Sequence, residues 1–145
     1  MGELTTEQGI VYILRNASGV SAIVAARIYP WDRVPQNAPL EYITYFRVAS
    51  NHIHDMSGPS GLVNPHMQVD CWAEKYSEAK ALAKQTRLAL DGYTGSVTIS
   101  TDSVTFRQIH MDDESDMFIP AGAGAETGPA RVSQDYTIWH TIAAS

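Results

Sequence analysis

Three histidines are close enough in the sequence to suggest a metal site. The stretch NHIHD (51–55) places His52 and His54 on the same side of an extended chain, and His66 could complete a set of three imidazole ligands. Such a set would suit a metal-dependent hydrolase. The alternative is a polar loop before a glycine-rich turn, and we favour it because the spacing matches no zinc signature. The sequence therefore predicts no resident metal or cofactor.

Other chemical groups also have simpler interpretations. A thiol nucleophile needs a neighbouring base and a lowered pKa. Cys71 alternates with Val69 and Ala73 on the apolar side of a strand pattern, so we expect an inert core residue. Asp70 and Glu74 share the opposite side, where ion pairs or solvent contacts are more usual than acid–base catalysis. Because the sequence also has no phosphate-binding loop, nucleophile elbow or dinucleotide fingerprint, we do not expect an enzyme.

A run of carboxylates lies in MDDESDMF (111–118). Its acidic members are Asp112, Asp113, Glu114 and Asp116. A calcium loop would alternate its oxygen ligands and place a glycine at the bend, and this run contains no glycine. We expect a charged turn at a sheet edge, where like charges discourage pairing with other strands.

The composition indicates one globular domain over residues 1–145. Hydrophobic residues make up 44% of the chain and charged residues 18%. The net charge of −6 opposes broad binding to nucleic acid, although a surface that repels DNA would let DNA slide past. A single cysteine excludes an intramolecular disulfide and suits a reducing compartment. The sequence has neither a signal-peptide pattern nor an apolar run that could span a membrane.

The elements that would position these groups follow from hydrophobic periodicity. We expect a helix over 4–17, ended by Gly19, and a second helix that begins at Ser77 and ends at Gly92. The predicted strands cover 41–50, 63–74, 104–111 and 131–142. SGPSG (57–61) predicts a turn. The order α-β-β-α-β-β predicts an α+β two-layer sandwich, with two helices on one face of an antiparallel sheet of about four strands.

This arrangement leaves the second face of the sheet uncovered. Strand alternation assigns Ile43, Tyr45 and Trp72 to that face, together with Tyr136 or Trp139. Exposed aromatic faces mark protein contacts. We therefore expect a protein interface with four candidate residues: Tyr42, Tyr45, Trp72 and Trp139.

Three stretches together resemble a known family. They are RIYPWDRVPQNAPLEYITYFRVAS, GLVNPHMQVDCWAEKYSEAKALAKQTRLAL and RVSQDYTIWH, which fall within residues 27–142. This pattern is similar to the tail-completion, or tail-terminator, proteins of long-tailed phages, prophages and gene-transfer particles. The resemblance implies a small α+β domain that works as a virion structural protein without catalysis.

The resemblance also implies a function and partners. The working unit would be a homohexameric ring at the head-proximal end of the tail, assembled in the host cytoplasm. It would cap the tail-tube protein, end tube polymerisation and contact the head–tail connector protein. DNA would pass through the lumen without sequence-specific binding. A head-completion or stopper protein at the portal is the alternative within the same particle, and a monomeric binding module is an alternative of another kind.

Two further groups of residues become candidates within that frame. An acidic lumen would let DNA slide, since it offers no cationic contacts that release counterions. The lumen candidates are Asp112, Asp113, Glu114 and Asp116. The Gly/Ala-rich segment 118–130 is expected to be a flexible loop that orders on the tube. Its candidates for tube contact are Phe118, Ile119, Gly122 and Gly124.

Overall fold

A computed structural model describes residues 5–36, 38–55, 58–118 and 130–141. The helices are α1 (Thr6–Asn16), α2 (Ser18–Val24) and α3 (Tyr76–Leu90). The strands are β1 (Ile28–Pro30), β2 (Tyr42–Asp55), β3 (Gly58–Ala73), β4 (Gly95–Ile99), β5 (Asp102–Phe118) and β6 (Ala130–Thr141).

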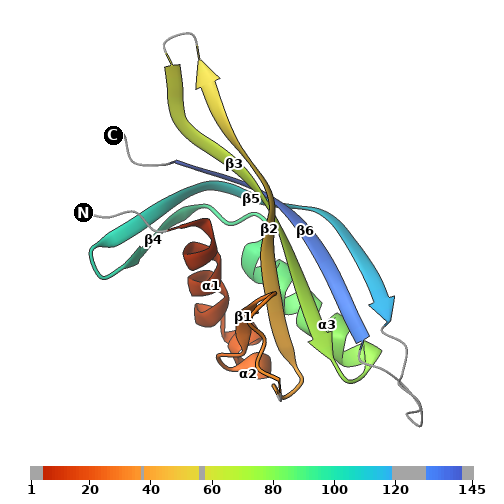
Figure 1. Cartoon of the computed structure of the whole chain (residues 1–145). Helices are drawn as coiled ribbons and strands as arrows, with labels where there is room; N and C mark the ends of the chain where they lie inside the picture. The colour runs from red at the N-terminus through yellow and green to blue at the C-terminus, as the bar shows by residue number, and fades with distance from the viewer. Residues whose placement is uncertain (1–4, 37, 56–57, 119–129, 142–145) are drawn as a thin grey trace.

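The six strands form one curled sheet in the order β1-β2-β3-β6-β5-β4, and the helices lie together on one face of it (Figure 1). All neighbouring strands are antiparallel except β1 and β2, which are parallel. The central strands β3 and β6 pair over most of their length, from Leu62 opposite Thr141 to Ala73 opposite Ala130. We call the side that carries the helices the covered face and the other side the open face.

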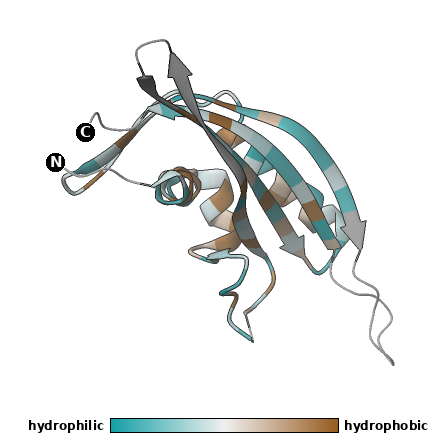
Figure 2. Cartoon of the chain, turned by 45° about the horizontal axis from the view of Figure 1, so that its top comes forward, coloured by the Kyte–Doolittle hydropathy of each residue, from teal (hydrophilic) through white to brown (hydrophobic). Residues whose placement is uncertain are grey.

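The covered face forms the core. Successive side chains of a strand point to opposite faces, so alternate residues of β3 and β6 point to the covered face. Along these strands hydrophobic residues are interspersed with hydrophilic ones (Figure 2). Met67, Val69 and Cys71 of β3 are all buried there. From β6, the buried side chains on this face are Val132, Gln134, Tyr136, Ile138 and His140. The sequence prediction that Cys71 is a core residue is confirmed.

Helix α1 packs closely against β5 because of one glycine. The helix begins with a capping box, in which the Thr5 hydroxyl accepts from the Gln8 backbone N–H and the Gln8 side chain accepts from the Thr5 backbone N–H. A Cβ atom on Gly9 would come within 2.6 Å of the Phe106 ring. Gly9 lowers intrinsic helix propensity, and the same residue permits this close contact between helix and strand.

Helix α3 ends where the sequence predicts, and its start differs slightly. Gly92 has φ +83° just after the helix, the left-handed conformation that glycine adopts readily at a helix end. The N-cap is Lys75, without a side-chain capping bond, so the prediction of Ser77 as N-cap is wrong. Ala79 and Ala83 are buried against the sheet, where their small side chains allow a close approach.

The sheet is larger than the predicted four strands, and the structure has three helices where two were predicted. Gly19 lies inside α2 rather than ending a longer first helix. The strands β1 and β4 are three and five residues long, too short to give a clear alternation in the sequence. Strand β3 begins at Gly58, so most of the predicted turn 57–61 is strand, and residues 56–57 lie outside the description.

The acidic run is a strand and not a turn. Residues 112–118 continue β5, and Asp113–Phe118 pair with β6. The described residues of β4 pair with β5 only from Asp102 to Phe106. The acidic segment of β5 therefore lies at the margin of the sheet. The predicted edge position is therefore confirmed, and the predicted turn is wrong.

Three residues assigned to the uncovered face lie on the covered face. Ile43 is opposite Cys71, Tyr45 is opposite Val69, and Tyr136 is opposite Met67. Ile43 and Tyr136 are buried, while Tyr45 is half-buried against the core. The stretch YITYF (42–46) has large apolar or aromatic residues at both phases of a strand, so alternation did not determine which phase faces the helices.

Candidate assembly surface

Aromatic side chains gather at one end of the open face, around Trp72. The Tyr42 ring stacks on the Trp72 ring, with centroids 5.9 Å apart and 20° between the planes. The Arg131 guanidinium lies 5.2 Å from the Trp72 ring centroid, a cation–π contact. The indole Nε1 donates to the Thr44 hydroxyl at 3.0 Å. These contacts hold Trp72 in one orientation, so this aromatic surface is preorganised.

The aromatic surface continues over β1 and the loop after it. The Tyr29 ring lies 6.0 Å from that of Tyr42, and the Trp31 ring lies 6.2 Å from that of Phe46. Trp31 is 63% exposed. Large exposed aromatic residues are the side chains that most often anchor protein interfaces.

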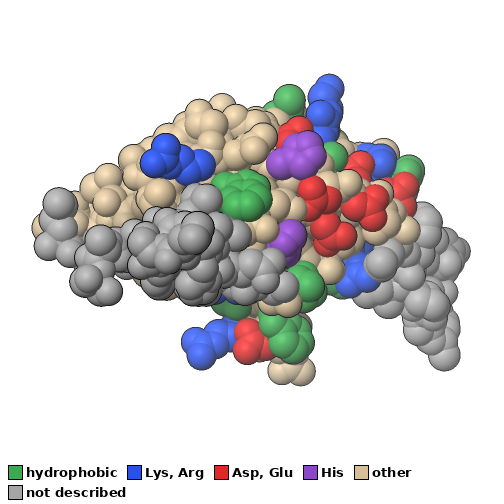
Figure 3. Space-filling view, turned by 90° about the horizontal axis from the view of Figure 1, so that it is seen from above, with side chains coloured by type: hydrophobic (Ala, Val, Ile, Leu, Met, Phe, Trp, Pro, Cys, Tyr) green, Lys and Arg blue, Asp and Glu red, His purple; other side chains and the backbone are tan. Residues whose placement is uncertain are grey.

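Four aspartates form a second region of the open face, which we call the acidic patch: Asp70, Asp112, Asp113 and Asp135. The strand register brings them together, because Asp135 is opposite Asp113 on β5 and opposite Gln68 on β3. Asp70 is 5% exposed, accepts from the Gln68 amide at 3.0 Å and lies 3.7 Å from an Arg131 nitrogen. Seen from above, acidic side chains gather next to histidines (Figure 3).

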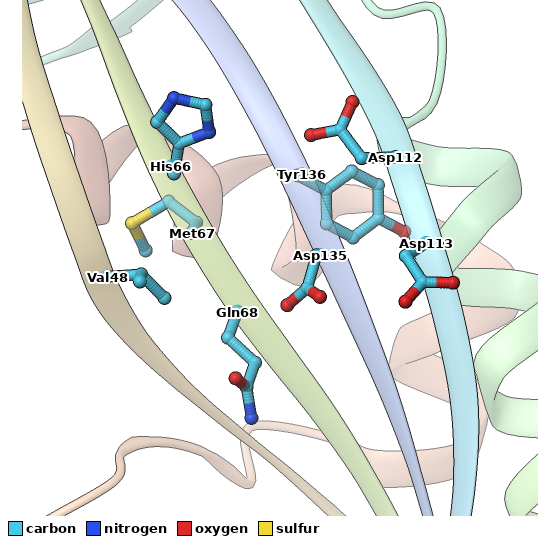
Figure 4. Close-up of a pocket in the computed structure, with 8 residues that line it drawn as sticks. All are labelled: Val48, His66, Met67, Gln68, Asp112, Asp113, Asp135 and Tyr136. Atoms are coloured by element: carbon cyan, nitrogen blue, oxygen red, sulfur yellow. The ribbon is translucent and has the colours of Figure 1, made fainter.

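An open hollow of about 400 Å³ lies beside the acidic patch (Figure 4). Val48 of β2 borders it on one side, and Asp112 and Asp113 of β5 border it on the other. Its remaining lining residues are His66, Met67, Gln68, Asp135 and Tyr136. One side of the hollow is therefore apolar and the other is strongly acidic.

The aspartates of the patch affect one another. Burial raises the pKa of Asp135 above its ordinary value of 3.8, and the charges of Asp113, Asp70 and Asp112 raise it further. A cation placed beside Asp135 would relieve this repulsion.

The other half of the acidic run lies on the opposite side of β5. Glu114 and Asp116 lie 3.5 Å and 3.3 Å from the Lys80 ammonium group of α3. The Tyr76 hydroxyl donates to Asp116 at 2.6 Å, and this bond, with the bond and charge of Lys80, lowers the pKa of Asp116 below 3.8. The four lumen candidates thus form two pairs on different faces rather than one continuous lining.

The remaining interface candidates have different environments. Tyr42 and Trp72 form the stacked pair on the open face. Trp139 is half-buried and alternates on β6 with the buried Ile138 and His140, which places it on the open face. Tyr45 is on the covered face, as described above. Phe118 is opposite Ala130 at the end of β5, and Ile119, Gly122 and Gly124 lie outside the described residues.

Of the three histidines considered for a metal site, the structure describes the side chain of His66. The His66 ring lies 3.2 Å from the Thr137 hydroxyl on β6. On the other side His66 is opposite Ala49 of β2, three positions from His52, which corresponds to about 10 Å along a strand. The side chains of His52 and His54 lie outside the description. Among the described residues, no three His, Cys, Asp or Glu side chains are grouped to hold a metal ion.

Cys71 has the properties of a structural thiol. Its sulfur lies 3.5 Å from the Thr86 hydroxyl, and burial raises its pKa to about 12. At neutral pH this thiol is protonated and shielded, so it is not an activated nucleophile. Within the described chain, no helix is long and apolar enough to cross a membrane.

Several residues of this surface were not among the candidates from the sequence. The open face also carries Asp135, Arg131 and Phe46, which strand pairing places beside the candidate residues. Trp31 joins them through its contact with Phe46. Alternation along RVSQDYTIWH would have placed Arg131 and Asp135 on the same face as Trp139.

A helix-covered core with an open sheet face, aromatic at one end and acidic beside it, is typical of a domain that works through contacts with other proteins. The family model for tail completion protein gp17 matches residues 8–141, so the chain belongs to this family of phage tail structural proteins.

A comparison with solved structures finds a chain of similar fold. The chain is similar to a chain in the virion of a native gene transfer agent (GTA) particle, with 15% sequence identity, a TM-score of 0.72 and 94% of each chain covered. A sequence comparison with curated proteins found no match.

Proposed function

We propose that the protein forms a ring that caps the phage tail tube. The ring, a homohexamer, ends tube polymerisation at the head-proximal end of the tail and provides the surface that joins the head connector. It assembles in the host cytoplasm, and the genome passes through its lumen. The family match over residues 8–141 is the observation that carries this proposal.

The open face supports an assembly function physically. A closed ring requires a heterologous interface, in which one surface of a subunit meets a different surface of the next. The open face carries aromatic and acidic side chains, and the helices lie on the other side of the sheet (Figure 1). A fixed cluster such as Tyr42, Trp72 and Arg131 loses little conformational entropy on binding, which favours its use as an anchor.

The acidic margin of β5 supports passage of DNA. Asp112 and Asp113 are exposed on one side of this segment, and Glu114 and Asp116 lie on the other. If this margin of β5 faces the ring axis, carboxylates from both sides of the strand approach the lumen. DNA then meets a surface of its own charge and forms no lasting contacts.

Reconstitution with purified tail tubes tests the proposal. Tubes from particles that lack this protein are incubated with soluble tube protein, and tube length is followed by electron microscopy. With the chain present, elongation stops and one end of each tube carries a ring. Continued elongation at the control rate contradicts capping. Binding to purified portal assemblies instead of tubes identifies a head-completion or stopper protein.

The Gly/Ala-rich segment supplies a second test. Its composition favours a segment that adapts to the tube, so a chain without residues 121–128 should fold normally and fail to cap. Circular dichroism and thermal unfolding check the fold, and the tube-length experiment checks capping. Tubes of normal length with this variant would show that the segment does not contact the tube.

A further inference from the structure

The two most exposed large aliphatic side chains that the structure describes lie on opposite sides of the molecule. Val48 is 58% exposed at the border of the hollow, and Leu88 is 60% exposed on α3. An exposed aliphatic residue alone is ordinary. These two residues have complementary surroundings: Val48 borders a hollow whose far side is acidic, and Leu88 shares a stripe of α3 with a lysine.

The outer surface of α3 is apolar and basic. Ala81, Lys84 and Leu88 are exposed and spaced three and four residues apart, so they lie on one stripe of the helix. Lys80 is held by Glu114 and Asp116 of its own chain. No ion pair joins Lys84 to any acidic side chain in the described part of the protein, so its charge is available to a partner.

The hollow on the open face has the complementary pattern. Val48 borders it at β2, and Asp135 lies on β6, two strands away. Neighbouring strands are about 4.8 Å apart, so the two positions are separated by roughly 10 Å across the sheet. On α3, Leu88 and Lys84 are one turn apart, or about 6 Å along the axis, and the long lysine side chain covers the remaining distance.

We propose that α3 of one copy docks into the hollow on the open face of the next copy. Leu88 packs against Val48, and the Lys84 ammonium group lies beside Asp135. The lysine charge offsets part of the repulsion at Asp135, and the leucine covers the apolar side of the hollow. One lysine leaves the acidic patch net negative, so Asp112 and Asp113 keep the margin of β5 acidic toward the lumen. This inference rests on the proposed function, since the contact would be the one that builds the ring.

The position of the two surfaces determines the kind of assembly. Helix α3 lies on the covered face and the hollow on the open face, so the contact joins different surfaces of the two copies. Such a head-to-tail contact does not form a two-fold dimer, because the same pairing repeats at every subunit. It forms a closed ring if the rotation between copies closes.

Cysteine cross-linking tests the contact directly. The chain carries Val48→Cys and Leu88→Cys, and its native Cys71 is buried and does not interfere. Oxidation of rings on tail tubes should give a ladder of covalent oligomers on a denaturing gel, up to the full ring. Each single variant should give no ladder, because its new thiol has no partner in the contact.

A charge exchange tests the pairing of Lys84 with Asp135. Lys84→Glu and Asp135→Lys should each reduce the ring population at least tenfold in native mass spectrometry with tail tubes. An equimolar mixture of the two variants should restore rings with alternating subunits, since each interface then pairs opposite charges. Arg15→Glu and Glu74→Lys are matched controls at exposed positions away from the contact, and they should form rings normally.

The outcomes separate this inference from the proposed function. Tubes capped without a cross-linked ladder would overturn the α3 contact and leave capping intact. A mixture that forms no more rings than either variant alone would also overturn it, provided that thermal unfolding shows both variants folded. Failure of the unmodified chain to cap tubes would instead contradict the proposed function.

Discussion

Gln134 and Asp135 are adjacent on β6, and their side chains lie on opposite faces of the sheet. Gln134 is fully buried. Its amide donates to the Ala83 carbonyl oxygen at 2.9 Å and to the Glu114 carboxylate at 2.8 Å, and its oxygen accepts from the Tyr136 hydroxyl at 2.8 Å. Asp135 is exposed and faces other aspartates of the acidic patch.

The difference indicates what each face contributes. On the covered face, polar groups have partners, because an unpaired buried group costs free energy. On the open face, charges of one sign accumulate although they repel one another. That arrangement lowers the stability of the isolated chain slightly, and it gives the surface a charge pattern that a cationic partner complements.

The largest expected effect comes from the apolar part of the covered face. Ile43→Ala should lower the free energy of unfolding by about 2–5 kcal/mol, because it removes buried methylene and methyl groups and leaves a cavity. Val48→Ala on the same strand should change it by less than about 0.5 kcal/mol, since that side chain is 58% exposed. Urea denaturation measures both. Equal losses would show that the two faces do not differ as the structure indicates.

The buried polar network should give the next largest effect. Gln134→Ala removes the acceptor of the Tyr136 hydroxyl, which is then buried without that partner, and should cost about 1–3 kcal/mol. The double variant with Tyr136→Phe should lose less than the sum of the two single changes, because no hydroxyl remains to be satisfied. Additive losses in a double-mutant cycle would contradict coupling between these residues.

On the open face, Trp72→Phe should have a smaller effect. It removes the indole N–H that donates to Thr44 and keeps an aromatic ring beside Tyr42, so we expect a loss of about 1 kcal/mol. Thr44→Val removes the same bond from the other side and is the matched control. A loss above about 3 kcal/mol in thermal or urea unfolding would mean that the aromatic surface is part of the core.

Much of the difference between the two faces can be predicted from the sequence, because it follows from regular alternation of residue types within single segments. In β3, small or apolar residues alternate with polar ones and Trp72, which places Cys71 in the core and Trp72 on the open face. Helix α3 has one apolar stripe and a glycine after its end, so its existence and C-terminus follow from local chemistry. In each case the information lies within one segment.

The remaining features depend on pairing between distant segments. The phase of β2 is fixed by the register that sets Ile43 opposite Cys71, and β1 exists because it pairs with residues 43–45 of β2. The acidic patch has the same origin. Asp113 and Asp135 belong to different strands, and only the β5–β6 register brings them side by side. Periodicity within a segment does not specify that register.

The smallest expected effect is a change in the pH dependence of stability, and it distinguishes the open half of the acidic surface from the covered half. The folded-state pKa of Asp135 is raised above 3.8, so ionised Asp135 disfavours folding at neutral pH, and this penalty disappears as the pH falls below 3.8. Asp135→Asn should therefore stabilise the protein at neutral pH by less than about 0.5 kcal/mol and have no effect near pH 3.

Replacing Asp116 should change the stability at neutral pH in the opposite direction. Its pKa is lowered, chiefly by the hydrogen bond from Tyr76, so its contribution to stability is present above 3.8 and is lost as the pH falls through the folded-state pKa. Asp116→Asn should thus destabilise the protein at neutral pH, and the difference should shrink in acid. Urea unfolding of both variants across this pH range measures the two signs. The same sign for both would mean that the acidic run acts as one uniform surface, whereas opposite signs would show that its covered half is paired within the chain and its open half is left for a partner.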